Sequence, residues 1–340
     1  MALYRLHCNY IMYESILGEV LRAYDIRPER IHRPQKGYRN EIWPVEVADG
    51  VIRNVTFFKR EDGIVDRVRR ADKVSEFLAD AGFPSRRRID SRLLRIKTPA
   101  AVLYAGAYTY LPGSTIPWEA YTMDHLKLLG KAMSDMHSLL EAMPASGLPL
   151  VYDEYRAILQ RMERYFSDAQ VTSAISRKLQ LKIDPAVFAR CAAVLDECQK
   201  AGGQQALHMD FVRGNILFGG PSTPDFTLHG TVLSGVLDFE KTAQGLPVVD
   251  VARTLAFLLV DCKYKPEKKV YKYFLHSGYI KRGEASAAIN EVLLEDLMTL
   301  FLLHDFYKFL RHNPYESLRA NEHYVRTRDI LHKRNMIRYL

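Results

Sequence analysis

The chain has 340 residues, 48% of them hydrophobic, so it is long and apolar enough for two folded domains or one large unit with a sizeable core. No apolar run approaches the roughly 20 residues of a membrane-spanning helix, which excludes an ordinary integral membrane protein. The formal net charge of +8 suits an anionic ligand such as a nucleotide, whereas the basic clusters are mixed with acidic or apolar residues and contain no nucleic-acid recognition motif.

The first third of the chain predicts a small, strand-rich domain. Apolar residues at helical spacing predict a helix over residues 12–25. Two alternating β-rich segments, residues 42–47 and 51–60, flank the turn sequence Ala-Asp-Gly and predict an antiparallel hairpin. A second helical stripe lies within residues 66–84, and two more strands are expected between residues 93 and 111.

A segment rich in proline and glycine, residues 111–117, marks the clearest boundary in the chain. We therefore expect one domain at residues 1–111 and a second at residues 112–340. The second is predicted to be mostly helical, with short β segments within residues 206–220 and 230–240.

One short loop of the second domain, "HMDFVRGN", carries polar side chains that suit phosphoryl transfer. In kinase-type transfer an aspartate orients the attacking hydroxyl and accepts its proton, and an asparagine five residues later holds a magnesium ion. Asp210 and Asn215 have this spacing, and His208 is expected to hold the loop by hydrogen bonds. Gly214 is expected to permit the tight backbone, and Arg213 is a candidate for contact with the γ-phosphate.

Two later aspartates extend the pattern. Asp238, in "GVLDFE", ends an apolar β run and is a candidate second magnesium ligand, like the strand-end Asp-Phe-Gly of protein kinases. Asp250, in "VVDVART", precedes an apolar helix, which it could cap. In kinase-like folds an aspartate there also braces the catalytic loop through backbone N–H groups, so we assign Asp250 a structural role.

The first domain offers candidates for nucleotide binding. Lys59 ends a β run and Glu76 lies on the following helix, and a strand lysine paired to a helix glutamate positions the α- and β-phosphates of ATP. Gly37 would let a hairpin backbone approach those phosphates, and the nearby Asn40 is assigned to the same site.

In these motifs the chain resembles the superfamily of aminoglycoside phosphotransferases, choline kinases and homoserine kinases, small-molecule kinases whose fold is similar to that of protein kinases. The resemblance covers nearly the whole chain and is most specific in "LHMDFVRGNILF", "GVLDFE" and "VVDVART". It implies an α+β, bilobal protein-kinase-like fold. The N-terminal lobe would be a small antiparallel sheet with one key helix, and the larger C-terminal lobe would be mainly helical.

The resemblance also implies an activity: transfer of the γ-phosphate of ATP, with Mg²⁺, to a hydroxyl of an amino alcohol, sugar, hydroxy-amino acid or antibiotic. It implies that Asp210 is the catalytic base, that Asn215 and Asp238 hold magnesium, and that Lys59 and Glu76 anchor phosphates. The backbone at Tyr110 and Leu111 would be the adenine hinge. One departure is Met209, which stands where the family usually has glycine.

Other readings of the same residues stay open at this point. A metal-dependent hydrolase would use His208, Asp210 and Asp238 as ligands of a transition metal and would have no use for Lys59. A catalytically silent nucleotide-binding protein would not need the full set of Asp210, Asn215 and Asp238. A protein kinase is disfavoured by the single glycine of the nucleotide loop and by the lack of an "APE"-like segment after "DFE".

The expected partners are a nucleotide and a small hydroxyl acceptor, with no nucleic acid and no membrane. The four cysteines lack paired spacing, which favours a cytoplasmic location. The basic C-terminal segment "EHYVRTRDILHKRNMIRYL" would repel a polycation, so we expect polycationic aminoglycosides to be poor acceptors.

Overall fold

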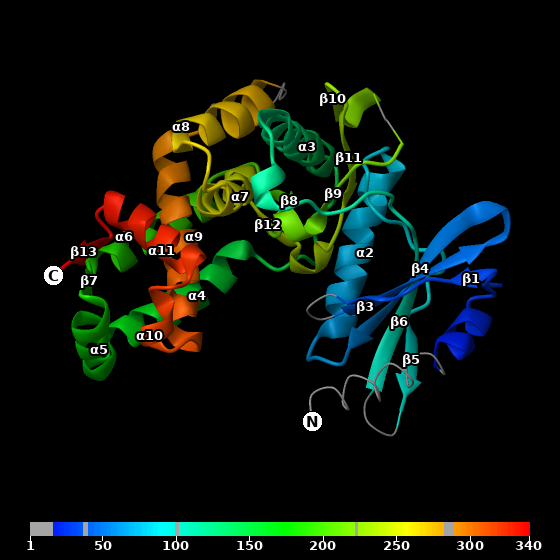
Figure 1. Cartoon of the computed structure of the whole chain (residues 1–340), viewed down its shortest axis with the longest axis horizontal. Helices are drawn as coiled ribbons and strands as arrows, with labels where there is room; N and C mark the ends of the chain where they lie inside the picture. The colour runs from blue at the N-terminus through cyan, green and yellow to red at the C-terminus, as the bar shows by residue number, and fades with distance from the viewer. Residues whose placement is uncertain (1–15, 37–39, 99–101, 222–223, 282–288) are drawn as a thin grey trace. The chain divides into compact units, whose positions relative to one another are not determined.

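The computed structural model describes residues 16–36, 40–98, 102–221, 224–281 and 289–340 (Figure 1). The chain divides into two compact units, Met1–Pro112 and Gly113–Leu340. The sequence placed the boundary one residue earlier, after Leu111.

The first unit is built on an antiparallel sheet with the strand order β1-β3-β4-β6-β5, in which β2 also pairs with β3 (Figure 1). Its strands are β1 (Arg30–Ile31), β2 (Gln35–Lys36), β3 (Asn40–Val47), β4 (Val51–Lys59), β5 (Leu94–Lys97) and β6 (Val102–Thr109). The predicted hairpin is confirmed, because β3 and β4 pair without a break around the turn η1 (Ala48–Gly50). Asp49 and Gly50 both take positive φ there, as a tight turn requires.

The two faces of this sheet are covered by different helices. A helix at residues 16–23 packs its apolar side chains into a cluster with Trp43, Val55 and Phe57. Phe58 points to the opposite face, where it packs with side chains of α2 (Ile64–Asp80). This alternation along β4 follows from the two-residue repeat of a strand.

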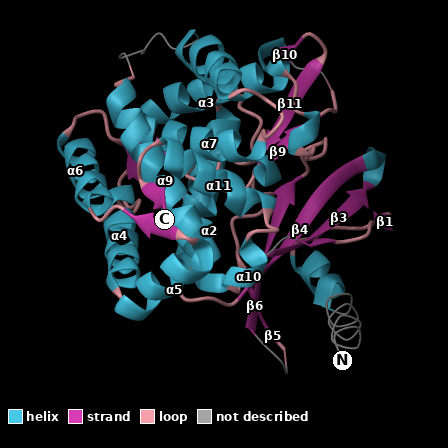
Figure 2. Ribbon diagram, turned by 60° about the vertical axis from the view of Figure 1, so that its left-hand side comes forward, coloured by secondary structure: helices cyan, strands magenta, loops and turns pink. Residues whose placement is uncertain are grey.

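The second unit is mainly helical (Figure 2). Its helices are α3 (Met123–Glu141), α4 (Val151–Ser167), α5 (Ala169–Leu179), α6 (Ala186–Lys200), α7 (Pro247–Asp261), α8 (Glu267–Val270), α9 (Glu291–His312), α10 (Tyr315–Leu318) and α11 (Glu322–Lys333). The helix η6 (Tyr271–Ile280) has π-type hydrogen bonding. α7 and α9 supply much of the core, since most of their side chains are buried.

Short antiparallel pairs complete the second unit. β8 (Gln205–Leu207) pairs with β12 (Ala243–Gly245), and β7 (Leu181–Ile183) pairs with β13 (Ile337–Tyr339). β11 (Thr231–Val236) lies between β9 (Ile216–Phe218) and β10 (Thr227–Leu228) and pairs with both. The loop at residues 208–215 runs from β8 to β9, so both of its ends are anchored by strand pairing.

None of the helices in the described ranges is long and apolar enough to cross a membrane.

Candidate active site

His208 holds the start of the loop at residues 208–215. Its Nδ1 accepts the backbone N–H of Asp210 at 3.0 Å, so its Nε2 carries the hydrogen and donates to the carbonyl of Leu237 at 3.0 Å. Burial lowers the pKa of His208, because a charged imidazolium would lose its hydration there. The ring therefore stays neutral and joins the loop to the end of β11.

Asp250, near the start of α7, holds the same loop by hydrogen bonds to its backbone. Its Oδ2 accepts the N–H of His208 at 2.8 Å and its Oδ1 accepts the N–H of Met209 at 2.9 Å. The Nε2 of His137 lies 3.3 Å from Oδ2. Burial alone would raise the pKa of Asp250, but the contacts with His137 and His208 outweigh it and lower the pKa, which keeps the carboxylate charged.

Met209 has the left-handed backbone of the loop, with φ of 59°. Such a conformation is uncommon for a residue with a side chain, and the bonds that Asp250 accepts from the N–H groups of His208 and Met209 offset its cost. The prediction that Gly214 permits a tight backbone in this loop is wrong. Its φ is not positive, and a Cβ there would meet no atom within 4 Å.

Asp210 is almost fully buried and receives three side-chain donors. Its Oδ1 accepts from Nζ of Lys241 at 2.8 Å and from a guanidinium nitrogen of Arg253 at 3.1 Å, and its Oδ2 accepts from Nδ2 of Asn215 at 3.1 Å. Burial by itself would raise the pKa of Asp210, but the charges of Lys241 and Arg253 lower it. The carboxylate is thus ionised at neutral pH, as a proton acceptor must be.

The sequence reasoning missed Lys241 and Arg253. Lys241 ends the turn η5 (Phe239–Lys241), three residues after Asp238. Arg253 follows Asp250 by three residues on α7, so helical spacing puts both on the side of the helix that meets the loop. That spacing was a usable signal. Arg253 is buried, and its guanidinium also donates to the hydroxyl of Tyr155 at 3.0 Å.

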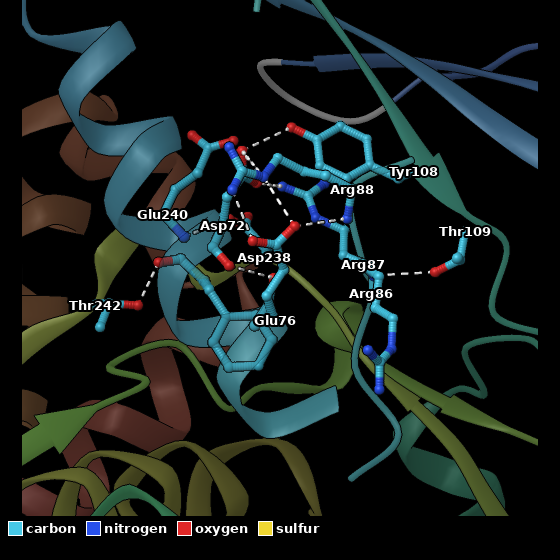
Figure 3. Close-up of polar contacts among 12 residues, drawn as sticks. Asp72, Glu76, Arg86, Arg87, Arg88, Tyr108, Thr109, Asp238, Glu240 and Thr242 are labelled. Carbon is cyan, nitrogen blue, oxygen red and sulfur yellow. Dashed lines mark hydrogen bonds and ion pairs between the residues drawn. The ribbon is translucent and has the colours of Figure 1, made fainter. Parts of the chain in front are cut away.

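Asn215 and Asp238 lie at the ends of two paired strands. The N–H of Leu237 donates to the backbone carbonyl of Asn215 at 2.8 Å, which brings the two candidate metal ligands to neighbouring positions. The Nδ2 of Asn215 faces Asp210, so its Oδ1 remains as a ligand atom. The carboxylate of Asp238 accepts the N–H of Glu240 at 3.3 Å (Figure 3) and has a second oxygen. Two hard oxygen donors fit Mg²⁺, which takes few protein ligands beside phosphates and water.

The hydrolase reading loses its histidine ligand. Both ring nitrogens of His208 are engaged in hydrogen bonds within the loop and to the end of β11. In the parts of the chain that are described, no group of three or more His, Cys, Asp or Glu side chains is arranged to hold a metal ion. The arrangement therefore favours the kinase reading of Asp210 and Asp238.

In the first unit, Glu76 pairs with Arg88 and not with Lys59 (Figure 3). The Nε of Arg88 donates to Oε1 of Glu76 at 2.8 Å, a guanidinium nitrogen donates to Oε2 at 2.7 Å, and the backbone N–H of Arg88 adds a third bond. Lys59 ends β4 with an exposed side chain that bonds no described residue. The predicted Lys59–Glu76 pair is thus wrong for this structure, because a forked guanidinium satisfies both carboxylate oxygens at once.

The positions of the other predicted nucleotide ligands do not show whether they bind a nucleotide. Asn40 begins β3 opposite Phe58, and Tyr110 and Leu111 follow β6 as half-buried residues. Gly37 lies outside the described residues. Arg213 begins the turn η3 (Arg213–Asn215) and is exposed. Their contact with a nucleotide stays a prediction.

Comparison with known proteins identifies the family of the chain. The family model described as "APH: Phosphotransferase enzyme family" matches residues 30–262. No curated protein matches the chain.

Several solved structures share the fold. A microcompartment-associated aminopropanol kinase is 14% identical with a TM-score of 0.68, covering 96% of this chain and 99% of its own. The amicoumacin kinase hAmiN, in complex with AMP-PNP, Ca²⁺ and Ami, is 13% identical with a TM-score of 0.64, covering 91% and 90%. The GDP complex of an aminoglycoside 2'-phosphotransferase-IIIa mutant is 14% identical with a TM-score of 0.57, covering 96% and 97%.

At these identities the solved structures establish the α+β, protein-kinase-like fold, while the family match spans more than half of the chain. The chain belongs to the phosphotransferase enzyme family and is a small-molecule kinase.

Proposed function

We propose that this kinase uses ATP and Mg²⁺ to phosphorylate a hydroxyl group of a small molecule. The observation that carries the proposal is the placement of Asp210. It is an ionised, buried carboxylate that is held by Asn215, on a loop whose backbone is fixed by Asp250. The amicoumacin kinase, solved with AMP-PNP and Ca²⁺, supports the use of a nucleotide and a divalent cation by this fold.

Asp210 would act on the acceptor. Its carboxylate accepts the hydrogen bond of the acceptor hydroxyl, orients its oxygen toward the γ-phosphate and takes its proton as the new bond forms. The cations Lys241 and Arg253 keep this carboxylate charged before the acceptor arrives.

Asn215 and Asp238 would hold the magnesium ion through Oδ1 and the carboxylate. When bound, the ion neutralises charge on the phosphates and lowers the barrier to transfer. The two residues fix its position relative to Asp210, because the Nδ2 of Asn215 bonds both the backbone and the side chain of that residue.

The first unit would supply the nucleotide contacts. Lys59, which bonds no described residue, is proposed to bind a phosphate, and Gly37 and Asn40 to contact the phosphates. Glu76 is proposed to act through Arg88, and the backbone at Tyr110 and Leu111 to contact the adenine.

Titration of the protein with Mg·ATP tests the proposal. We expect Asn215→Ala and Asp238→Ala each to weaken Mg·ATP binding, because each removes one of two protein ligands of the metal. Asp153, which has an exposed carboxylate on α4, provides the control, and Asp153→Ala should bind Mg·ATP as tightly as the wild type. Unchanged Mg·ATP affinity in both site variants would remove this pair from the site, and no nucleotide binding by the wild-type chain would overturn the proposed function.

A further inference from the structure

Positive charge beside Asp210 exceeds what one carboxylate can balance. Lys241 lies 2.8 Å and Arg253 3.1 Å from the same oxygen, Oδ1. Arg253 is buried and also interacts with the charge of Asp250, whereas the side chain of Lys241 is 49% exposed. Two cations on one carboxylate oxygen favour the approach of a further anion from the solvent side of Lys241.

Helix α9 adds a third cation to this group. The hydroxyl of Tyr155 accepts a hydrogen bond from Arg253. The ring of Tyr155 also contacts His304 of α9, with 6.1 Å between ring centroids. Lys308 follows His304 by four residues, so the two side chains share one face of α9. The ammonium of Lys308 has no hydrogen bond or ion pair with any described residue.

The pKa values show that these charges act on one another. Lys308 is an exposed residue, but the protein near its ammonium lowers its pKa, and the charges of Arg253 and Lys241 lower that pKa further. Burial, followed by the charges of Lys308 and Arg253, lowers the pKa of His304 to about 3, so this ring is neutral. The charges of Asp305 and Asp210 act on Lys308 in the opposite direction, and Asp305 is also engaged with His323 at 2.7 Å.

We infer that the acceptor of this kinase carries an anionic group, a carboxylate or a phosphate, near the hydroxyl that receives the phosphoryl group, and that Lys308 and Lys241 bind it. The inference rests on the proposed function. An acceptor anion would relieve the repulsion among the three cations while Asp210 binds the hydroxyl. A polycationic acceptor would add to that repulsion.

The basic C-terminal segment is not the source of this field. Arg326 donates to backbone carbonyls at the end of α7, including that of Leu259 at 2.8 Å. Arg334 pairs with Glu295, and Lys333 pairs with Glu267. The cations beside Asp210 would add to the expected repulsion of polycations, and their location would also attract an anion.

The first experiment compares matched acceptors with the wild-type protein. ADP formation is measured with pairs in which one member carries an anionic group, such as glycerate and glyceramide, which have nearly the same shape, or glycerol 3-phosphate and glycerol. We expect the anionic member of at least one pair to have the higher kcat/KM, by about 10- to 100-fold, the usual size of a charge-assisted contact. A panel in which no anionic member is preferred overturns the inference. Turnover of neutral members alone would leave the proposed function standing.

A second experiment tests Lys308 itself. In Lys308→Gln the preference for the anionic member should fall about tenfold through a higher KM, and Lys308→Arg should restore it, since the lost contact is to a part of the acceptor that does not react. Lys200→Gln, at an exposed position ending α6, is the matched control and should keep the wild-type preference. If Lys308→Gln raised the KM for ATP and left the acceptor preference unchanged, the cations would serve the nucleotide and the inference would fail.

Discussion

At Asp210, three donors converge on the carboxylate that is proposed as the base. The change Asp210→Asn keeps the size of the side chain and removes its basicity. We expect kcat to fall by about 10²- to 10⁴-fold, the usual contribution of a positioned base, with Mg·ATP binding nearly unchanged. Near-normal turnover of Asp210→Asn with its best acceptor would contradict the assignment of the base.

Lys241 sets the pH range in which Asp210 is ionised. Its charge helps to lower the pKa of Asp210, so removing the charge raises that pKa. In Lys241→Met the loss of kcat/KM on the acid side should therefore begin at a higher pH than in the wild type. The pH profile of Lys241→Arg is the control, because arginine keeps the charge. An acid limb that stays in place in Lys241→Met would show that another group sets it.

Single residues show how far sequence reasoning reaches at this scale. The bracing by Asp250 was predicted, and its two bonds to the loop backbone are present, because a motif of fixed spacing fixes local geometry. The partner of Glu76 was not predicted. Residues 86–88 are all arginines, and only the folded chain shows that Arg88 is the one that reaches Glu76. The left-handed Met209 was also beyond prediction, since methionine has no preference for that conformation.

At the scale of elements, α3 and η6 meet at two glycines. A Cβ on Gly130 would lie 2.0 Å from the carbonyl oxygen of Phe274, and one on Gly278 would lie 2.6 Å from that of Lys127. These are backbone atoms, so neither side chain can be added without moving a helix. His137 of α3 bonds Tyr279 of η6 at 2.8 Å and also contacts Asp250, which holds the loop at residues 208–215.

Gly130→Ala should therefore destabilise the protein. Overpacking typically costs about 1–3 kcal/mol, which corresponds to a drop in Tm of several degrees for a unit of this size. Gly18→Ala is the control. Its Cβ would meet no atom within 4 Å, and alanine favours the helix. An unchanged Tm in Gly130→Ala would mean that α3 and η6 separate without cost.

Elements with a strong local pattern were the predictable ones. The hairpin of β3 and β4 followed from alternation and its turn. The helix α2 ends just before Gly82, whose φ of 83° is typical of a glycine that follows a helix. The helix η6 could not be predicted from such a pattern, because π-type hydrogen bonding has no distinct apolar period in the sequence. It occurs here where the helix packs on α3.

At the scale of the second unit, His323 joins three helices. From α11 its Nδ1 lies 2.9 Å from Asp261 at the end of α7, and its Nε2 lies 2.7 Å from Asp305 of α9. Burial alone would lower the pKa of His323, but the two carboxylates raise it from 6.5 to about 9. Because the folded pKa is the higher one, the stabilisation is complete below pH 6.5 and is lost as the pH rises through about 9.

The variant His323→Gln tests this dependence. We expect the difference in Tm between wild type and variant to be largest near pH 6 and to shrink steadily as the pH approaches about 10. His312→Gln, at an exposed position in the last turn of α9, should show no such trend. A difference in Tm that does not change with pH would mean that the ion pairs of His323 contribute nothing to folding.

The carboxylate of Asp250 has a consequence for motion. It has no exposed surface, and it holds the amide hydrogens of His208 and Met209. Amides bonded in this way exchange with deuterated solvent only when the surrounding structure opens, so both should rank with the slowest amides of the second unit. The segment that bears Asp210, the proposed base, would then be among the most rigid of the second unit, and any opening needed to admit acceptor or release product has to come from other segments.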